Sequence, residues 1–339
     1  MIPVRATLAL LACLFAVRAQ ANPAADFYKG ATVTMVVSTS AGGGYDTLAR
    51  AIARQLGKHI PGHPTIVVRN MPGAGGIIAT NYLYSAAPRD GSVLGLIQSD
   101  PPLEPLFGAK QAQFDPLKFN WLGTPSVETA MVLVWRTVPV NSVDDLRRRV
   151  TEMGASGANS TPAFYARLLN VTLGTKMKVI PAYPGQNDAF LAMERGELDG
   201  YPSVFYSALS STRPTWLPEK KVKVIVQFGS EKLAALGEVP FAPDLVTNPQ
   251  DKQVMEVAFT PLALGRPLLM PPGVPADRVA IMRQALMATF VDSAFLADAK
   301  KIGLQVNSPR DGDQLVQVIE RAYRAPPQII ERLRKLNEP

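Results

Sequence analysis

Cysteine and histidine are nearly absent from this sequence of 339 residues. The single cysteine, Cys13, lies in an apolar N-terminal stretch, and the two histidines, His59 and His63, share a connection rich in proline and glycine. The remainder of the chain therefore has neither a disulfide nor a thiol nucleophile. No third ligand stands near the histidines to complete a metal site. We expect no metal and no cofactor.

Sets of catalytic residues are also missing. Ser156 and Ser160 lack the sequence pattern of a nucleophile elbow, and no histidine stands near them to act as a base. Carboxylate pairs such as Asp144 and Asp145 are typical of solvated helix faces, and nothing groups an acid, a base and a nucleophile. The sequence argues against an enzyme, and a hydrolase that uses glycine loops as an oxyanion hole is the enzymatic alternative.

Long apolar runs are absent beyond the first twenty residues. Arg5 precedes an apolar run at 6–17, and Ala19-Gln20-Ala21 offers small residues for cleavage. A run of about 12 residues is too short for a membrane-spanning helix, which needs roughly 20. We therefore expect residues 1–21 to be a cleaved signal peptide and the product to be exported and soluble.

The overall composition is that of a globular protein with a basic surplus. Hydrophobic residues make up 47% and charged residues 19%, which excludes a disordered chain. The length exceeds one ordinary core of roughly 100 to 200 residues, so two domains are predicted. A net charge of +7 favours encounter with anions. The basic residues are scattered rather than clustered, which argues against nucleic acid as a partner.

Strand-like and helical segments alternate along the chain. A β-branched run at 32–38 leads through a glycine turn into a helical pattern at 46–56, and the same order recurs downstream. This alternation predicts parallel βαβ units in an α/β fold. Later strands are expected at 178–181, 198–201, 222–227 and 255–264, and later helices at 276–290 and 312–322.

A glycine-rich loop between the first strand and the first helix is the sharpest local feature. Gly42, Gly43 and Gly44 expose backbone N–H groups, and the helix N-terminus adds partial positive charge, so the loop is a candidate anion cradle. Tyr45 and Asp46 stand where a phosphate loop needs Lys followed by Ser or Thr, which excludes that motif. A plain turn is the alternative.

A second candidate loop at 154–161 leads into another predicted helix. It carries hydroxyl, amide and backbone N–H donors that suit an oxyanion, although the same residue types also form ordinary helix caps. The glycine turn at 72–76 is interpreted instead as close packing of a helix start on the sheet.

An ordered set of segments resembles the substrate-binding proteins of tripartite tricarboxylate transporters, the Bug family. The resemblance begins at Ala41-Gly42-Gly43-Gly44-Tyr45-Asp46 with Leu48-Ala49-Arg50, and covers nearly the whole chain after the signal peptide. It continues through 67–76, 86–91, Tyr183-Pro184-Gly185-Gln186, Gly196-Glu197-Leu198-Asp199 and 263–275.

The resemblance implies a two-lobed α/β clamp of the periplasmic-binding-protein kind, type II-like, in which each lobe is a mixed sheet flanked by helices. Residues 22–125 and 258–339 would form a discontinuous first lobe, and residues 126–257 the second. It further implies a monomeric periplasmic receptor that captures a small organic carboxylate and delivers it to large and small membrane subunits. A ligand-sensing receptor that feeds a sensor kinase is the alternative.

The family likeness also implies the ligand-binding residues. The segments 39–46 and 155–161 should face the cleft from opposite lobes, and the strand end at 98–100 should line it. The expected set is Thr39, Ser40, Gly42, Gly43, Gly44, Tyr45, Asp46, Gln98, Ser99, Asp100, Ser156, Ala158, Asn159, Ser160, Tyr183, Gln186 and Ser203.

The chain departs from the family pattern at two positions that bear on the ligand. Family members often carry an aromatic residue where Thr39 stands and an acidic one where Ser203 stands. An acid at the second position would suit a ligand amino group, so its absence argues against an amino acid. Aromatic acids stay open because Tyr45, Tyr183 and Tyr201 are available to line a pocket.

Overall fold

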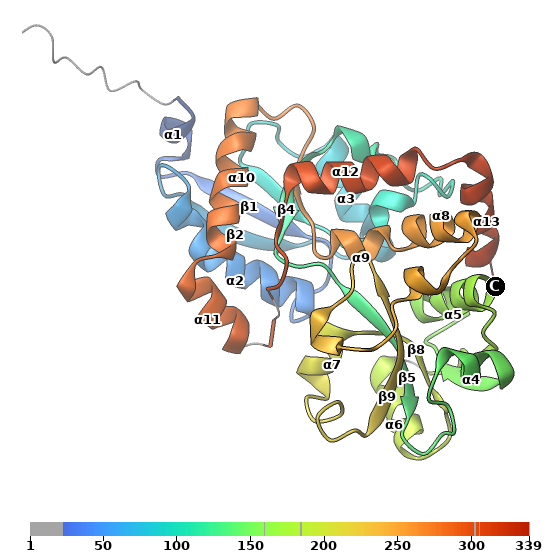
Figure 1. The fold of residues 1–339 in the computed structure, drawn as a ribbon. Coiled ribbons are helices and arrows are strands. Elements are labelled where there is room, and N and C mark those ends of the chain that lie inside the picture. The colour runs from blue at the N-terminus through green and yellow to red at the C-terminus, as the bar shows by residue number, and fades with distance from the viewer. Residues whose placement is uncertain (1–22, 159, 184, 302, 305, 339) are drawn as a thin grey trace, which may run out of the picture.

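Two mixed β-sheets, each covered by helices, form the two lobes of the molecule (Figure 1). The computed structural model describes residues 23–158, 160–183, 185–301, 303–304 and 306–338. The predicted signal peptide at 1–21 and the predicted site residue Asn159 lie outside the described residues. The α/β fold with two mixed sheets that the sequence predicts is confirmed.

The first sheet has the strand order β11-β4-β10-β3-β1-β2, in which β1 is parallel to β2 and β3, and β10 is antiparallel to its neighbours. Helices α2, α10 and α11 cover one face, and α3 and α12 cover the other. The elements of this lobe are α1 (Pro23–Tyr28), β1 (Thr32–Val37), α2 (Gly44–His59), β2 (Thr65–Asn70), α3 (Ile77–Ser85), β3 (Val93–Leu96), β4 (Asn120–Thr124), β10 (Leu268–Met270), α10 (Ala276–Phe290), α11 (Ser293–Lys301), β11 (Arg310–Asp311) and α12 (Gly312–Tyr323).

The second sheet has the order β7-β6-β8-β5-β9, with β6 parallel to β7 and β8, and β5 antiparallel to β8 and β9. Its elements are β5 (Thr129–Trp135), α4 (Val143–Arg148), β6 (Thr151–Gly154), α5 (Thr161–Leu173), β7 (Met177–Ile180), α6 (Gln186–Glu194), β8 (Gly200–Phe205), α7 (Tyr206–Thr212) and β9 (Val222–Gly229). Three further helices, α8 (Pro249–Ala258), α9 (Thr260–Leu264) and α13 (Pro327–Asn337), lie beside the junction of the lobes (Figure 1).

Strand β5 shows why the second sheet is buried on both faces. Its side chains alternate, so Ala130 and Val132 enter the core under α5, while Met131 and Leu133 enter a separate core under α6. Such a strand has no polar face, which explains its nearly continuous apolar sequence.

Two chain segments join the sheets side by side. Residues 125–128 connect β4 to β5, and α8 and α9 bring the chain back to β10. The backbone N–H of Glu128 donates to the carbonyl of Leu262 at 2.9 Å, which ties the two segments together. Gly265 has φ +62 and packs so tightly that a Cβ there would lie 1.9 Å from the Ser126 carbonyl oxygen. This junction is where a hinge between the lobes would act.

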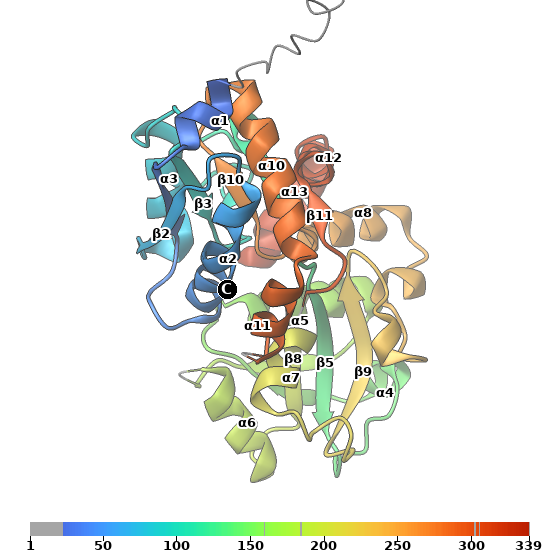
Figure 2. The same ribbon diagram turned by 90° about the vertical axis from the view of Figure 1, so that its left-hand side faces the viewer.

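The C-terminal helix α13 packs against α5 and α8, and its Ile329 and Leu333 belong to the same core as the second sheet (Figure 1). In the view of Figure 2, α13 lies behind α10, on the far side of the molecule. The predicted first-lobe range of 258–339 includes this helix. The lobe boundaries stay a prediction, and this packing favours grouping 327–337 with the second lobe.

The strand predicted at 255–264 is wrong. This segment forms the end of α8 and the whole of α9. Asn248 caps α8 by accepting a hydrogen bond from the Gln250 N–H, and Pro249 occupies the first turn, both of which favour a helix. A short apolar run fits a buried helix as well as a strand, so periodicity alone misassigned it.

No single helix among the described residues is long and apolar enough to cross a membrane, and only the bent pair α10 and α11 passes that test jointly, by length and composition.

Candidate functional site

A cavity of about 370 Å³ lies between the two sheets and receives side chains from both lobes and from both connecting segments. Its lining residues are Tyr45, Gln98, Ser99, Asp100, Glu128, Ser156, Thr161, Pro162, Tyr165, Gln186, Tyr201, Ser203, Phe205, Pro261, Leu262, Gly265 and Arg266. The parallel strands explain this grouping, because β1, β3, β6 and β7 each end in a loop on the side where the lobes meet.

Three helices begin at this cavity. Tyr45 is the second residue of α2, Thr161 and Pro162 are the first two of α5, and Gln186 is the first of α6. Among the described residues, no N-cap side chain makes a capping hydrogen bond to any of the three helices. Because the first N–H groups of a helix have no partner within it, α2, α5 and α6 present donors and partial positive charge toward the cavity.

Asp46 holds the glycine loop before α2 in place through hydrogen bonds. The Asp46 carboxylate accepts from the Gly42 N–H at 2.8 Å, from Asn70 Nδ2 at 2.9 Å and from Arg50 through two bonds. These bonds, those from Arg50 first, lower the pKa of Asp46 to about 2 although the side chain is buried. One of the predicted cradle donors is therefore already bound to a side chain of the protein.

The predicted site residues divide into two groups. Seven of them line the cavity, namely Tyr45, Gln98, Ser99, Asp100, Ser156, Gln186 and Ser203. The others that the structure describes belong to the same loops without lining it, namely Thr39, Ser40, Gly42, Gly43, Gly44, Asp46, Ala158, Ser160 and Tyr183.

Ser160 illustrates the second group. Ser160 occupies the N-cap position of α5, but its hydroxyl does not accept a hydrogen bond from the first N–H groups of the helix. It donates instead to the Gly157 carbonyl at 2.7 Å. The hydroxyl thereby closes its own loop and leaves the first turn of α5 free of a side-chain cap.

Sequence reasoning missed Glu128 and Arg266, the two charged residues at the base of the cavity. Glu128 is 7% exposed, accepts from the Ser207 hydroxyl at 2.7 Å and lies 3.7 Å from the Arg266 guanidinium. Arg266 also lies over the Tyr45 ring, 5.7 Å from its centroid. Arg266 lies in the segment 263–275 that resembles the family, so the resemblance could have pointed to it. No local sequence pattern marks Glu128.

The environment of the cavity shifts the pKa of its acids. Burial raises the pKa of Glu128, and the nearby Arg266 and Ser207 oppose this effect. The Asp100 side chain is exposed to the cavity, yet desolvation by the surrounding protein raises the pKa of its carboxyl group. Burial also raises the pKa of Tyr45 to about 12, so this phenol stays protonated at neutral pH, and its O–H donates to the Gly265 carbonyl at 3.4 Å.

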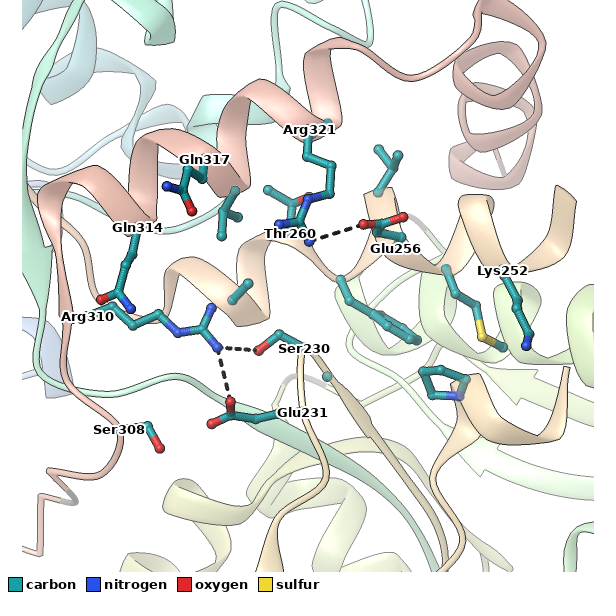
Figure 3. A pocket seen from close by; sticks show the side chains of 18 of the residues that line it. Ser230, Glu231, Lys252, Glu256, Thr260, Ser308, Arg310, Gln314, Gln317 and Arg321 are labelled. Atoms are coloured by element: carbon teal, nitrogen blue, oxygen red, sulfur yellow. Dashed lines mark hydrogen bonds and ion pairs between the residues drawn. The ribbon is translucent and has the colours of Figure 1, made fainter. Parts of the chain in front are cut away.

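A larger hollow of about 660 Å³ lies at another part of the lobe junction, between α8, α9 and α12 (Figure 3). Its two arginines are already paired, because Arg310 lies 3.2 Å from Glu231 and 3.2 Å from Ser230, and Arg321 lies 3.2 Å from Glu256. Helix α12 begins here with a closed capping box at Asp311, so its N-terminus offers no free cap. Helix α9 also begins here, at Thr260, but it has only five residues, so this hollow has fewer long uncapped helix starts than the smaller cavity.

No group of three or more His, Cys, Asp or Glu side chains within the described ranges is arranged to hold a metal ion.

Two helix-covered lobes, joined by adjacent connecting segments around a polar cavity, define a solute-binding protein of the two-lobed periplasmic class. Residues 48–334 match the family model described as Tripartite tricarboxylate transporter family receptor, TctC, and the chain belongs to this family.

Curated relatives and solved structures agree with this assignment. Protein BugT of Bordetella pertussis is 38% identical over 236 residues, which are 62% of this chain and 71% of the relative. A protein from the TAR-I intergenic region of Agrobacterium vitis is 29% identical over 52% of this chain, and the match spans about half of that relative's length, 51%.

Solved structures of similar fold match nearly the whole chain. A TctC solute-binding protein from Polaromonas, without ligand, matches 91% of this chain and 98% of its own length, with a TM-score of 0.70 and 19% identity. MatC from Rhodopseudomonas palustris, with bound malate, matches 91% and 99%, with a TM-score of 0.58 and 23% identity. A second R. palustris protein, with adipate, matches 90% and 97%, with a TM-score of 0.60 and 20% identity.

Proposed function

We propose that this protein is an exported receptor that binds a small carboxylate in the interlobe cavity and delivers it to the membrane subunits of a tripartite tricarboxylate transporter. The observation that carries the proposal is the convergence of the uncapped N-termini of α2, α5 and α6 on one cavity. Uncapped helix starts are suited to an anion because they combine free N–H donors with the positive end of the helix dipole.

The size and composition of the cavity support a small organic acid. A volume of about 370 Å³ is in the range of small-molecule sites. Tyr165, Tyr201 and Phe205 contribute apolar surface that suits the carbon skeleton of an organic acid. Gln98, Ser156 and Gln186 contribute polar donors that suit its carboxylate. The relatives with bound malate and adipate make dicarboxylates the first candidates.

Binding between lobes gives a mechanism for recognition by a partner. A ligand that contacts α2 in one lobe and α5 and α6 in the other has more contacts when the lobes are closed, so it shifts the population toward the closed form. Membrane subunits that read the closed shape would then receive only loaded receptor. The receptor itself needs no chemical step, and we propose that it has no catalytic activity and loses residues 1–21 on export.

A ligand screen tests the proposal. The protein from Asn22 onward is melted with mono-, di-, tri- and aromatic carboxylates, and positive results are measured again by calorimetry. A ligand at about 100 times its Kd adds about 2.7 kcal/mol of apparent stability, which is readily detected. A selective shift with submillimolar Kd is expected. Absence of binding to every class would contradict the carboxylate function and leave the fold unaffected.

A second experiment tests delivery. A strain that lacks the gene should lose uptake of the ligand found in the screen, and the full-length gene should restore it. Uptake that continues unchanged without the receptor would contradict the transport role even if binding is confirmed.

A further inference from the structure

The charge of the cavity is opposite to that of the whole chain. The sequence carries a net charge of +7. The charged side chains that line the cavity are nevertheless two acids, Asp100 and Glu128, and one base, Arg266. An adjoining hollow of about 330 Å³ shares Asp100 with the cavity and adds Glu104, and no lysine or arginine is among its lining residues that the structure describes. A simple anion entering this space meets more negative than positive side chains.

The one base is already engaged. Arg266 lies 3.7 Å from Glu128, whose carboxylate is nearly fully buried, and it stacks over Tyr45. The nearby negative charge of Glu128 offsets much of the field that Arg266 would otherwise present to a ligand. Glu128 therefore forms part of the protein's own ion pair.

Asp100 is the acid left without a partner. It lies four residues after the end of β3 and lines both hollows. No hydrogen bond or ion pair to its carboxylate occurs among residues 23–338 so far as they are described, and its only recorded bond is through its backbone carbonyl, to the Leu103 N–H. Burial is the main cause of the raised pKa of Glu104, Tyr45 and Tyr165, and the negative charge of Asp100 adds to it for each group, so Asp100 acts across the cavity. Repulsion from this carboxylate disfavours a ligand that is only an anion.

Ser203 on the opposite lobe offers a further polar contact to a ligand. The residue lies in β8 and is only 5% exposed, yet it lines the cavity, and its hydroxyl has no hydrogen-bond partner within the described ranges. The hydroxyl oxygen is not among the buried atoms that lack a partner, so it is open to the cavity, where a ligand can take the place of solvent as its partner. The cavity therefore has an accessible hydroxyl on one lobe and an unpaired carboxylate on the other.

We propose that the ligand carries an ammonium group in addition to its carboxylate, and that Asp100 binds the ammonium group while the starts of α2, α5 and α6 bind the carboxylate. This inference rests on the proposed function and narrows its ligand class to amino acids or similar zwitterions. In the sequence, the serine at position 203 argues against an amino acid as ligand, because an acid at that position would suit the ligand's amino group. The structure places an acid in the same cavity from the other lobe, at Asp100.

Matched ligands of one skeleton test the inference. Calorimetry compares aspartate, malate and succinate, which differ only in bearing an ammonium, a hydroxyl or a hydrogen on one carbon, and then glutamate with glutarate. Hydrogen bonds to charged groups contribute enough for a discrimination of about 10- to 100-fold in Kd. The wild-type protein is expected to prefer the ammonium-bearing member of each set by at least about tenfold.

Asp100→Asn keeps the shape of the side chain and removes its charge. We expect it to lose most of the preference for the ammonium-bearing ligand and to bind succinate or glutarate more tightly than the wild type does. Asp144→Asn is the matched control, because Asp144 is exposed on α4 and its one ion pair among the described residues is with Arg147. Thermal melting of both variants confirms that they fold.

The outcomes separate the inference from the function on which it rests. Loss of the preference in Asp100→Asn but not in Asp144→Asn supports the inference. Equal or tighter binding of the acids that lack an amine by the wild type overturns it while the carboxylate function stands. A preference that survives in Asp100→Asn also overturns it. Failure of every ligand, with and without an amine, overturns the carboxylate function and the inference together.

Discussion

Replacing Arg266 with methionine separates a structural role from a binding role at the base of the cavity. In the wild type, the 3.7 Å pair with Arg266 compensates the Glu128 carboxylate, whose side chain is 8% exposed. In Arg266→Met, the Ser207 hydroxyl is the remaining side-chain donor to Glu128 that the structure describes. Removing one member of a buried pair costs about 3–5 kcal/mol, and contact with the cavity should reduce this to about 2 kcal/mol.

The pH dependence of this loss follows from the sign of the Glu128 shift. Burial already raises the pKa of Glu128, and loss of Arg266 removes an opposing cause, so the native state of the variant binds protons more readily than the unfolded chain. Stability then falls as pH rises through this range and recovers as pH falls. We expect the deficit of Arg266→Met to be largest at pH 7 and to shrink toward pH 4.5, the ordinary pKa of a glutamate.

Urea unfolding and calorimetry together provide the assay. The double variant Arg266→Met with Glu128→Gln removes both charges and should regain most of the lost stability. Because the starts of α2, α5 and α6 are proposed to bind the ligand carboxylate, the double variant should also keep most of its affinity. A loss of about 10- to 100-fold in Kd, the size expected for a charge-assisted contact, would show that Arg266 contacts the ligand as well. A double variant as unstable as the single one would refute the pairing. Unchanged affinity in Arg266→Met would show that this residue serves the fold alone.

Two further predictions concern the loops around the cavity. The pKa of Asp46, lowered to about 2 chiefly by the bonds from Arg50, means that its ionised form adds stability above the ordinary pKa of 3.8, and this stability is lost as pH falls toward 2. Asp46→Asn should lower the free energy of unfolding at pH 7 by about 1 kcal/mol, a small value because Arg50 is half exposed. The stability of the variant should also change less with pH in this acidic range, and an unchanged pH dependence would contradict the reasoning. Gly265→Ala should cost about 3 kcal/mol, because the new Cβ would overlap the Ser126 carbonyl oxygen at positive φ; a melting temperature equal to the wild type would contradict the tight packing of the connecting segments.

Much of the fold was predictable from local pattern. Helices α10 and α12 lie where helical spacing predicts them, and β1 follows its β-branched sequence. The short strands β4, β6, β10 and β11 were missed. Strands of two to five residues hold too little periodicity to be distinguished from loops, and their pairing with distant strands decides their structure.

The candidate site was predictable where a residue follows the end of a buried strand. Gln98, Ser99 and Asp100 after β3, and Ser156 after β6, reach the cavity because the ends of parallel strands meet at one edge of a sheet. The anion cradle at the glycine loop stays a prediction, and sequence alone does not show that Asp46 folds back to bind the Gly42 N–H.

The sequence by itself determined the class of this protein, its α/β composition and the helix starts that suit an anion, since these depend on residues close together in the chain. The tertiary structure decided which of those starts converge, which charges neutralise one another and which acid is left free. Glu128 and Arg266 are 138 residues apart in the chain and meet only because both connecting segments pass between the lobes. Long-range juxtaposition of this kind leaves no local pattern, and here it sets the charge that a ligand encounters.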